Sequence, residues 1–462
     1  MANGARADGP LGIRPRLNGP GSSHPAADGP LGIRPRPNGP GSSHPATTEP
    51  GFLAARRERA AGLSATLELP QFKGRPGWEF TDLSGLDLAA YTPADASGAG
   101  QVAAVSAEAV FAPDALAELR QVDGGEATLT GPLPTGVIVA SLEVAAREHP
   151  ELVERHLGTV VDSDDVFVAR NDAGFRGGAF VYVPAGVALE RPILLSAVQS
   201  QDATELHRRT LIVLEPGSQA EVWESISSAT VDTDGVFNTV VELKLSADSR
   251  LRFVSGQDLS ERSWIFGTHR AEVARDAALD WVALGFGSAH GHVRMETRLG
   301  GPGADARVTG AYATHGRQHI DFDTTQEHAA PNTTSDLAFR GVLQGRSSAV
   351  WKGNIIVDPD AQKTDAFQES RNLLLSKRAH ADAIPGLEIQ ANDVRCTHAA
   401  AIAQVDPEQL FYLRSHGLPD ELAKRLVIEG FLSALVERFE PGPVREVLGE
   451  AIDRRLALIL GG

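Results

Sequence analysis

Short apolar runs separated by small polar turns dominate the middle of the chain, from about residue 164 to about residue 405. The runs are rich in branched and aromatic residues, which is typical of β-strands. They include VFVAR, AFVYVP, PILLSAV, TLIVLE, VVELKL, LRFVS and WVALGF. Because almost no helical pattern interrupts them, this part of the sequence predicts a mainly β body.

A repeated device at the strand ends indicates how these strands are arranged. An apolar residue ends a strand, a small polar turn follows, and apolar–polar alternation resumes, with one set of side chains inside and their neighbours outside. Antiparallel hairpins would give the same alternation, but the regular spacing of the turns favours a solenoid of strands. The device follows Leu214, Leu245, Val273, Leu299 and Leu343.

Helical patterns flank this body on both sides. Toward the N-terminus, Phe52, Leu53 and Leu63 surround a charged run and predict a short helix that ends before Pro70. The stretch Leu142–Leu157 has a second helical pattern. The β body is therefore expected to carry a helical region at its N-terminal end.

Three further helices are predicted after residue 405. Asp406 is an acidic N-cap, Pro407 occupies the first helical position and Gln409 is placed to cap back. Gly417 ends this helix and Pro419 begins the next. The apolar stripes of the last two helices must be buried either against the body or against another protein, and the pattern alone does not choose.

The first 46 residues differ from the rest in composition. The segment Ala7–Ala26 recurs as Ala27–Ala46, with differences only at Leu17 and Pro37. Gly, Pro and Ser dominate both copies, so a disordered tail is predicted. The predicted organisation is a duplicated tail (1–46), an N-terminal helical or mixed region (47–162), the β body (163–405) and a C-terminal helical domain (406–462).

Charge and cysteine content limit the environment and the partners. A net charge of -17 argues against nucleic acid and anionic membranes as partners. The single cysteine excludes an intrachain disulfide and any metal site built from several of the chain's own thiolates. The sequence has no apolar run of membrane-spanning length and no signal-peptide pattern at its start, so a cytoplasmic protein is expected.

Chemical motifs are few. The phosphate-binding pattern GxxxxGK[ST] and the hydrolase pattern GxSxG are both missing from the sequence, so the chain is expected to hydrolyse no nucleotide by itself. His319, Asp321 and Asp323 alternate with apolar residues on a predicted strand and share one face. Hard or borderline metals accept such ligands, but a solvated outer face explains the alternation equally and is favoured.

Cys396 and His398 form a more specific candidate for a metal site. On a strand the two side chains emerge on the same face, where a thiolate and an imidazole suit a soft or borderline metal such as iron or zinc. They supply two ligands at most, so a stable site needs donors from elsewhere. A buried, inert cysteine is the favoured alternative from spacing alone, and a Cys/His nucleophile pair stays open.

Four blocks of sequence carry a family resemblance. They are Ala361–Leu418, His328–Val357, Asn171–Leu195 and, more loosely, GWEFTDL at Gly77–Leu83. These blocks occur along the chain in the family's order, and they resemble the SufB/SufD family of iron–sulfur cluster assembly proteins, the SufD branch more than the SufB branch. The resemblance implies a right-handed parallel β-helix core flanked by an N-terminal helical region and a C-terminal helical domain.

The resemblance also implies a complex and a cargo. Family members assemble SufB, SufD and two copies of the ATPase SufC, so this chain is expected to be a non-catalytic scaffold beside a SufB-like paralogue, with ATP used only through SufC. The cargo is a transient iron–sulfur cluster shared with a partner subunit and passed to apoproteins, with sulfur donor proteins acting indirectly. Flavin use stays open.

The resemblance carries over to particular residues. His398 matches the SufD histidine thought to face a SufB cysteine across the subunit interface, and Cys396 matches the cysteine beside it. The C-terminal helices are expected to dock SufC, with Leu422, Leu426 and Phe431 as partner-binding residues. Two alternatives remain: a homomeric SufB-like scaffold, and a β-helix carbohydrate-active enzyme, which sparse aromatic residues and the missing signal pattern disfavour.

Overall fold

A computed structural model describes residues 49–72, 77–96, 110–163 and 165–460. The chain divides into two units, Met1–Gly41 and Ser42–Gly462. The first unit lies outside the described residues, and so does the predicted disordered tail over residues 1–46. The fold described below is that of the second unit.

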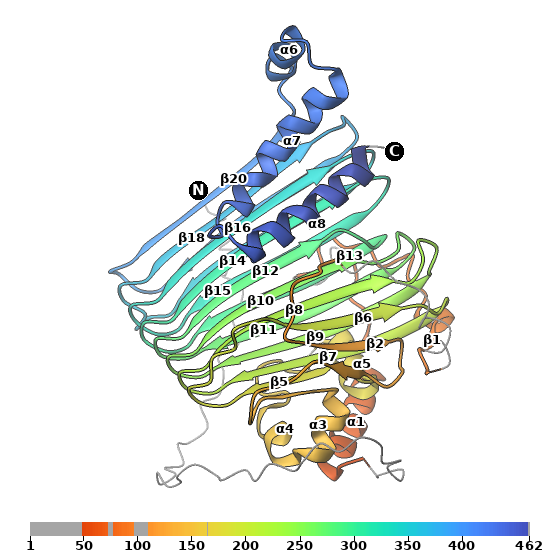
Figure 1. The fold of residues 1–462 in the computed structure, drawn as a ribbon, viewed down its shortest axis with the longest axis vertical. Helices are drawn as coiled ribbons and strands as arrows, with labels where there is room; N and C mark the ends of the chain where they lie inside the picture. The colour runs from red at the N-terminus through yellow and green to blue at the C-terminus, as the bar shows by residue number, and fades with distance from the viewer. Residues whose placement is uncertain (1–48, 73–76, 97–109, 164, 461–462) are drawn as a thin grey trace, which may run out of the picture. The chain divides into compact units, whose positions relative to one another are not determined.

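Two long β-sheets form the body, and the chain alternates between them (Figure 1). We call them sheet A and sheet B. Sheet A contains β5 (Ala179–Val183), β7 (Thr204–Leu214), β9 (Gly235–Leu245), β11 (Trp264–Val273), β13 (His290–Leu299), β15 (His319–His328), β17 (Ser348–Val357) and β19 (His380–Ile389). Sheet B contains β6 (Ile193–Gln199), β8 (Gln219–Ser228), β10 (Arg250–Asp258), β12 (Ala278–Gly285), β14 (Asp305–Thr314), β16 (Thr334–Leu343), β18 (Asp365–Leu374) and β20 (Arg395–Gln404).

From β7 and β8 onward, each strand pairs in parallel with the strand one turn earlier, which makes the body the predicted parallel β-solenoid. Short strands add to its N-terminal end. In sheet A, β4 (Ile138–Ala140) pairs antiparallel with β5, and β1 (Thr92–Pro93) pairs with β7. In sheet B, β2 (Ala117–Val122) pairs with β6, and β3 (Thr128–Thr130) pairs antiparallel with β2.

The corners of the solenoid confirm the turn device. Leu214, Leu245, Val273 and Leu299 end β7, β9, β11 and β13, so all four turns lead from sheet A to sheet B. Leu343 ends β16 and therefore belongs to the opposite corner. In the turns that lead from sheet A to sheet B, positive φ angles of 61°, 53° and 74° occur at Asp248, Asp276 and Gly303. Their N–H groups donate to carbonyl oxygens of the next turn, which explains the small polar residues there.

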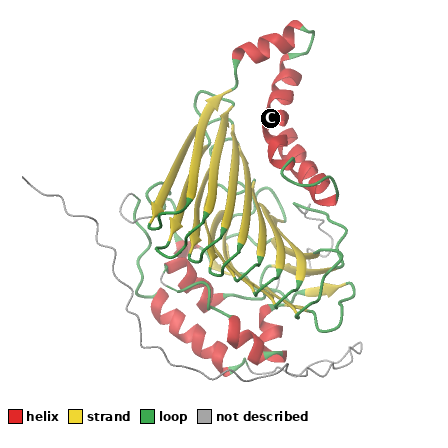
Figure 2. Cartoon of the chain, turned by 90° about the vertical axis from the view of Figure 1, so that its left-hand side faces the viewer, coloured by secondary structure: helices red, strands yellow, loops and turns green. Residues whose placement is uncertain are grey.

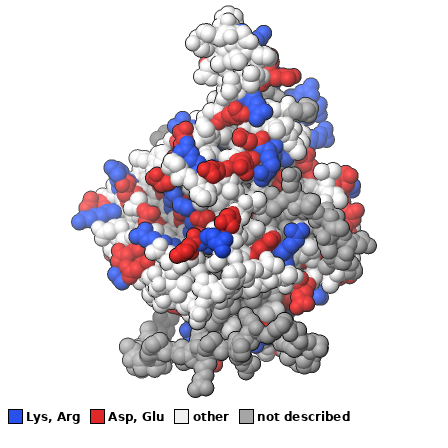
Figure 3. Space-filling model, in the orientation of Figure 1, with Lys and Arg blue, Asp and Glu red and all other residues white. Residues whose placement is uncertain are grey.

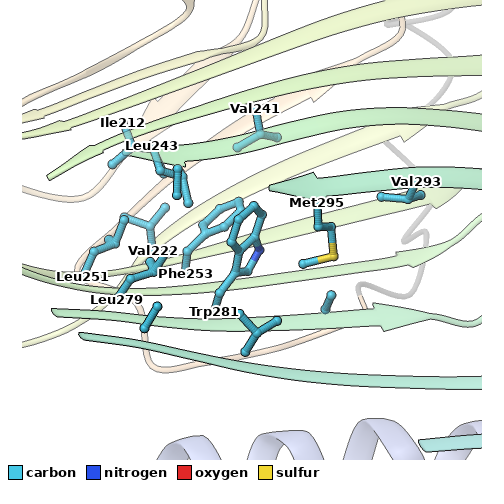
Figure 4. Close-up of a cluster of buried hydrophobic side chains, with 14 of the residues drawn as sticks. Ile212, Val222, Val241, Leu243, Leu251, Phe253, Leu279, Trp281, Val293 and Met295 are labelled. Carbon is cyan, nitrogen blue, oxygen red and sulfur yellow. The ribbon is translucent and has the colours of Figure 1, made fainter. Parts of the chain in front are cut away.

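The interior of the solenoid is filled by alternate side chains of both sheets (Figure 4). On β12, Leu279 and Trp281 join this interior cluster, while Val282 between two inward positions packs on the outer side of sheet B. Burial of a side chain of this size contributes about 1.5–3 kcal/mol. The interior cluster includes Ile212, Val222, Val241, Leu243, Leu251, Phe253, Val293 and Met295.

The N-terminal helices correct two details of the sequence prediction. VFVAR, predicted as a strand, begins the helix α5 (Val166–Gly174), where Asp165 accepts a hydrogen bond from the N–H of Phe167. A short apolar run does not distinguish a strand from a buried helix. The stretch Leu142–Leu157 is two helices, α3 (Leu142–Glu148) and α4 (Pro150–His156), because Pro150 has no N–H to continue α3. The first predicted helix is confirmed as α1 (Gly51–Ser64).

The three predicted C-terminal helices are confirmed as α6 (Pro407–Ser415), α7 (Asp420–Val436) and α8 (Pro443–Leu460). The Asp406 carboxylate accepts from the N–H of Glu408, and Gly417 has a φ of +89° after α6. Helices α7 and α8 lie along the outer face of sheet B (Figures 1 and 2). Most of the buried apolar residues of these two helices pack against sheet B: Ile428, Leu432, Leu435, Leu448, Ala451, Ile452, Leu456 and Ile459.

Candidate functional site

The last turn of the solenoid leaves both sheets open. Strands β19 and β20 stand at the ends of the two sheet orders and pair only with β17 and β18 within the described sheets. An edge of this kind presents unpaired backbone N–H and C=O groups to any strand that approaches. Large apolar side chains are exposed on the same two strands: Ile384 (36%), Ile389 (43%) and Ile402 (45%).

Cys396 and His398 lie together on β20, facing the interior of this open turn. Their parallel register partners on β18 are Ala366 and Gln368, which are both buried. Registered neighbours in a parallel sheet face the same side, so the thiol and the imidazole share the interior face, as their spacing predicts. Because no strand follows β20 in the sheet, the His398 side chain remains exposed.

The Cys396 thiol is the more enclosed of the two groups. It packs against the apolar cluster that includes Ile355, Val357 and Ala366. This burial raises the pKa of the thiol, and the negative charge of Asp365 raises it further. The group is therefore a neutral thiol at neutral pH, and it requires a bound metal or a nearby base to become a thiolate.

This site contains few side chains that can bind a metal. Cysteine sulfur and histidine nitrogen are both ligands that iron–sulfur clusters accept. In the part of the chain that the structure describes, no group of three or more His, Cys, Asp and Glu side chains is arranged to hold a metal ion. The pair therefore offers two donors on an open face of β20.

His319, Asp321 and Asp323 share the outer face of sheet A on β15, as predicted, but that face is not solvated at Asp321. Asp321 is only 3% exposed. Its Oδ2 accepts from the Thr81 hydroxyl at 2.7 Å and lies 3.1 Å from Nδ1 of His292. The prediction was wrong here because the covering residue, Thr81, lies far away in sequence and nothing in the β15 pattern indicates it.

The three predicted partner-binding residues of α7 divide into two groups. Leu422 and Leu426 are each 42% exposed on the first half of the helix. Phe431 is half-buried: the Arg340 guanidinium lies 5.1 Å from its ring centroid, and Arg340 Nη1 donates to its carbonyl oxygen. The first half of α7 is therefore available to a partner, and Phe431 contacts sheet B.

Two further exposed residues belong beside this surface. Phe411 and Tyr412 on α6 are 73% and 63% exposed, and α6 has no buried residue. Figure 3 shows few charges at the top of the molecule, where Figure 1 places α6. These aromatics are not among the residues predicted from the sequence, although two adjacent large apolar residues in a helix without an apolar stripe are a recognisable signal.

Comparisons with known proteins cover both the body and its N-terminal region. The family model of the SUF system FeS cluster assembly SufBD core domain matches residues 197–431, and that of the SufBD protein N-terminal region matches residues 123–195. An iron–sulfur cluster assembly protein SufD of Bacillus subtilis is 33% identical over 326 residues, which are 70% of this chain and 74% of the relative. This chain belongs to the SufBD family.

Other SufBD family proteins extend the match. A relative from Synechocystis is 27% identical over 421 residues, 88% of this chain and 92% of its own length. A relative from Mycobacterium leprae is 34% identical over 232 residues, 48% of this chain and 59% of its own length. The SufBD core match includes Cys396, His398, Leu422 and Leu426.

Family membership confirms the resemblance found in the sequence. The protein is a SufBD-family iron–sulfur cluster assembly protein of the SUF system. Among the helices that the structure describes, none is both long enough and apolar enough to cross a membrane.

Proposed function

We propose that this chain is the SufD-like scaffold subunit of a SufB–SufC–SufD complex, in which it helps to assemble nascent iron–sulfur clusters and to transfer them to apoproteins. The observation that carries the proposal is the Cys396–His398 pair on the open interior face of β20. Two donors of the correct chemistry, without the remaining ligands, fit a cluster shared between two subunits.

A SufB-like paralogue is the proposed partner at this end of the solenoid. The unpaired edges of β19 and β20 accept a partner strand by β-augmentation, and the exposed isoleucines beside them gain burial when the strand arrives. The partner then brings its cysteine ligands close to His398. A shared site with mixed nitrogen and sulfur ligands releases its cluster more readily than a site of four thiolates, which suits a transient cargo.

SufC is the proposed partner of the exposed helical surface. This surface, formed by Phe411, Tyr412, Leu422 and Leu426, has the exposed aromatic and aliphatic side chains that anchor protein interfaces. SufC would supply the ATP hydrolysis that the sequence of this chain does not provide for. The chain itself acts as a non-catalytic scaffold in this proposal, with no role assigned to flavin, and its single cysteine fits the reducing cytoplasm.

Anaerobic co-expression with a SufB-like paralogue and SufC tests the proposal. The purified complex is expected to contain iron and sulfide, and His398→Ala is expected to remove most of both while all subunits still co-purify. His380→Ala is the matched control, because His380 lies on the neighbouring edge strand β19 and is also exposed. Full iron and sulfide content in the His398→Ala complex contradicts the assigned site, and a self-paired chain that holds a cluster favours the homomeric alternative.

A further inference from the structure

A cavity of about 250 Å³ lies between the segment around Trp78 and the outer face of sheet A. One wall is aromatic. Trp78 stacks on Phe167, with ring centroids 5.3 Å apart, and Phe167 stacks on Phe266 at 3.9 Å. The floor is formed by strands β11, β13, β15 and β17 of sheet A, whereas Cys396 and His398 lie on β20 of sheet B.

The floor of the cavity alternates in charge. Arg294, Asp323 and Lys352 stand in one register row on the neighbouring strands β13, β15 and β17. Neighbouring strands are about 4.8 Å apart, so positive, negative and positive groups follow one another at roughly that spacing. Glu296, two residues after Arg294 on the same face of β13, adds a second negative group to the lining.

These charges are paired only at long distances, and Glu296 Oε2 also lies 3.5 Å from Arg270 Nε. Lys352 Nζ is 3.5 Å from Asp323 Oδ2, and Arg294 Nε is 3.5 Å from Glu296 Oε1. Arg294 Nε is also buried without a hydrogen-bond partner among the described residues. By comparison, Arg307 Nη2 meets Asp280 Oδ2 at 2.6 Å elsewhere on the solenoid. Loose pairs of this kind keep hydrogen-bonding capacity for a ligand.

A histidine adds an oriented acceptor to the cavity. Asp321, held by the Thr81 hydroxyl, lies 3.1 Å from Nδ1 of His292, and His292 lines the cavity. A carboxylate at Nδ1 favours the tautomer with its proton on that nitrogen, which makes Nε2 the lone-pair acceptor. A further carboxylate at the cavity, Asp165, already caps α5.

We propose that this cavity binds a small zwitterion of the α-amino acid class. The ligand carboxylate pairs with Arg294, and its ammonium group lies at Asp323 and Glu296, the two carboxylates next to Arg294. Its side chain faces the aromatic wall. A simple anion is opposed by the two carboxylates, and a simple cation is opposed by Arg294 and Lys352, whereas a zwitterion satisfies both sets. Burial raises the pKa of Asp323, and a bound ammonium group would relieve that cost.

Titration of the full chain with free amino acids tests this inference, read by calorimetry and by ligand-observed saturation-transfer NMR. The probes are L-alanine, L-cysteine and L-phenylalanine, with L-alaninamide and N-acetyl-L-alanine as analogues that lack one of the two charges. At least one free amino acid is expected to bind, and its amide and acetyl analogues are expected to bind at least about tenfold more weakly.

Arg294→Gln is expected to weaken binding by at least about tenfold, and Arg298→Gln is the matched control on the same face of the same strand. Arg298 pairs with Glu272 and Glu327 and does not line the cavity. The inference is overturned if none of the amino acids binds at about 10 mM, if the analogues bind equally well, or if the two variants behave alike. A thermal melt shows that the variants are folded, and the cluster content of the complex, measured separately, reports on the proposed function instead.

Discussion

At the scale of single residues, the Cys396 thiol decides how the open turn behaves before any cluster arrives. Its pKa is raised by burial and by the charge of Asp365. The interior face therefore presents a protonated thiol beside an exposed imidazole at neutral pH. This state is less nucleophilic and less easily oxidised than a thiolate, as the proposed function requires of a cluster ligand before the cluster binds.

Alkylation of the only cysteine measures this property directly. The rate of reaction of the isolated chain with iodoacetamide is expected to rise with pH, with a midpoint above the value of about 8.5 for a free thiol. Mass spectrometry reads the product without ambiguity, because Cys396 is the single cysteine. A midpoint below that of a free thiol would show an activated cysteine and would support the nucleophile alternative.

Residue pattern alone predicted the position of the pair but not its surroundings. The two-residue spacing places Cys396 and His398 on one face of any strand. The pairing of β20 with β18 shows which face is interior and that this turn is the last one. Such pairing depends on the whole chain, so the local pattern does not predict it. The prediction that Asp321 is solvated was wrong for the same reason, since Thr81, which covers it, lies 240 residues earlier in the chain.

At the scale of elements, the C-terminal helices serve two purposes along their length. The second half of α7 and most of α8 bury their apolar stripes on sheet B, while α6 remains exposed, as do Leu422 and Leu426 on the first half of α7. The sequence predicted these helices and their caps, because Asp406, Pro407 and Gly417 act locally. It did not divide the stripes between the body and a partner, because both uses require the same apolar spacing.

Leu426→Asp tests whether the exposed helical surface binds SufC. A charged group in the centre of the proposed interface is expected to weaken SufC binding by at least about tenfold in a calorimetric titration. Leu458→Asp is the control, since Leu458 on α8 is 55% exposed and lies outside the proposed surface. Equal binding by both variants would show that SufC docks elsewhere.

Arg455 attaches helix α8 to the solenoid. Its Nε donates to the carbonyl oxygen of Ala313 and its Nη2 donates to Gln318 Oε1, each at 2.9 Å. Arg455→Leu removes both hydrogen bonds, although the N–H of His315 still donates to Gln318 Oε1, and it is expected to lower the free energy of unfolding by about 1–3 kcal/mol in urea. Removing the exposed Arg425, which pairs with Glu429 on the surface of α7, is expected to change it by less than about 0.5 kcal/mol. Similar losses in both variants would contradict the anchoring role.

At the scale of the whole molecule, buried histidines set the response to acid. Burial lowers the pKa of His269 to about 3 and that of His328 to about 4. Both rings stay neutral in the fold but take up protons in the unfolded chain below about pH 6.5. Their contribution to stability is therefore complete above pH 6.5 and is lost as the pH falls toward 4.

Denaturant unfolding at several pH values checks this response. Each histidine contributes a slope of about 1.4 kcal/mol per pH unit between about pH 6.5 and 4.5, so the two together lower stability by roughly 5 kcal/mol over that range. His269→Leu is expected to remove about half of this slope. Replacing the exposed His380 is expected to leave the slope unchanged. An unchanged slope in His269→Leu would show that this ring is protonated in the fold.

The central claim at this scale is that the chain holds an incomplete ligand set and carries a cluster only together with another subunit. Anaerobic reconstitution with iron and sulfide, followed by desalting and analysis of both elements per chain, tests it most directly. The isolated chain is expected to retain neither element, and the complex with a SufB-like paralogue is expected to retain both. A stable iron–sulfur cluster on the isolated, monomeric chain would contradict the account.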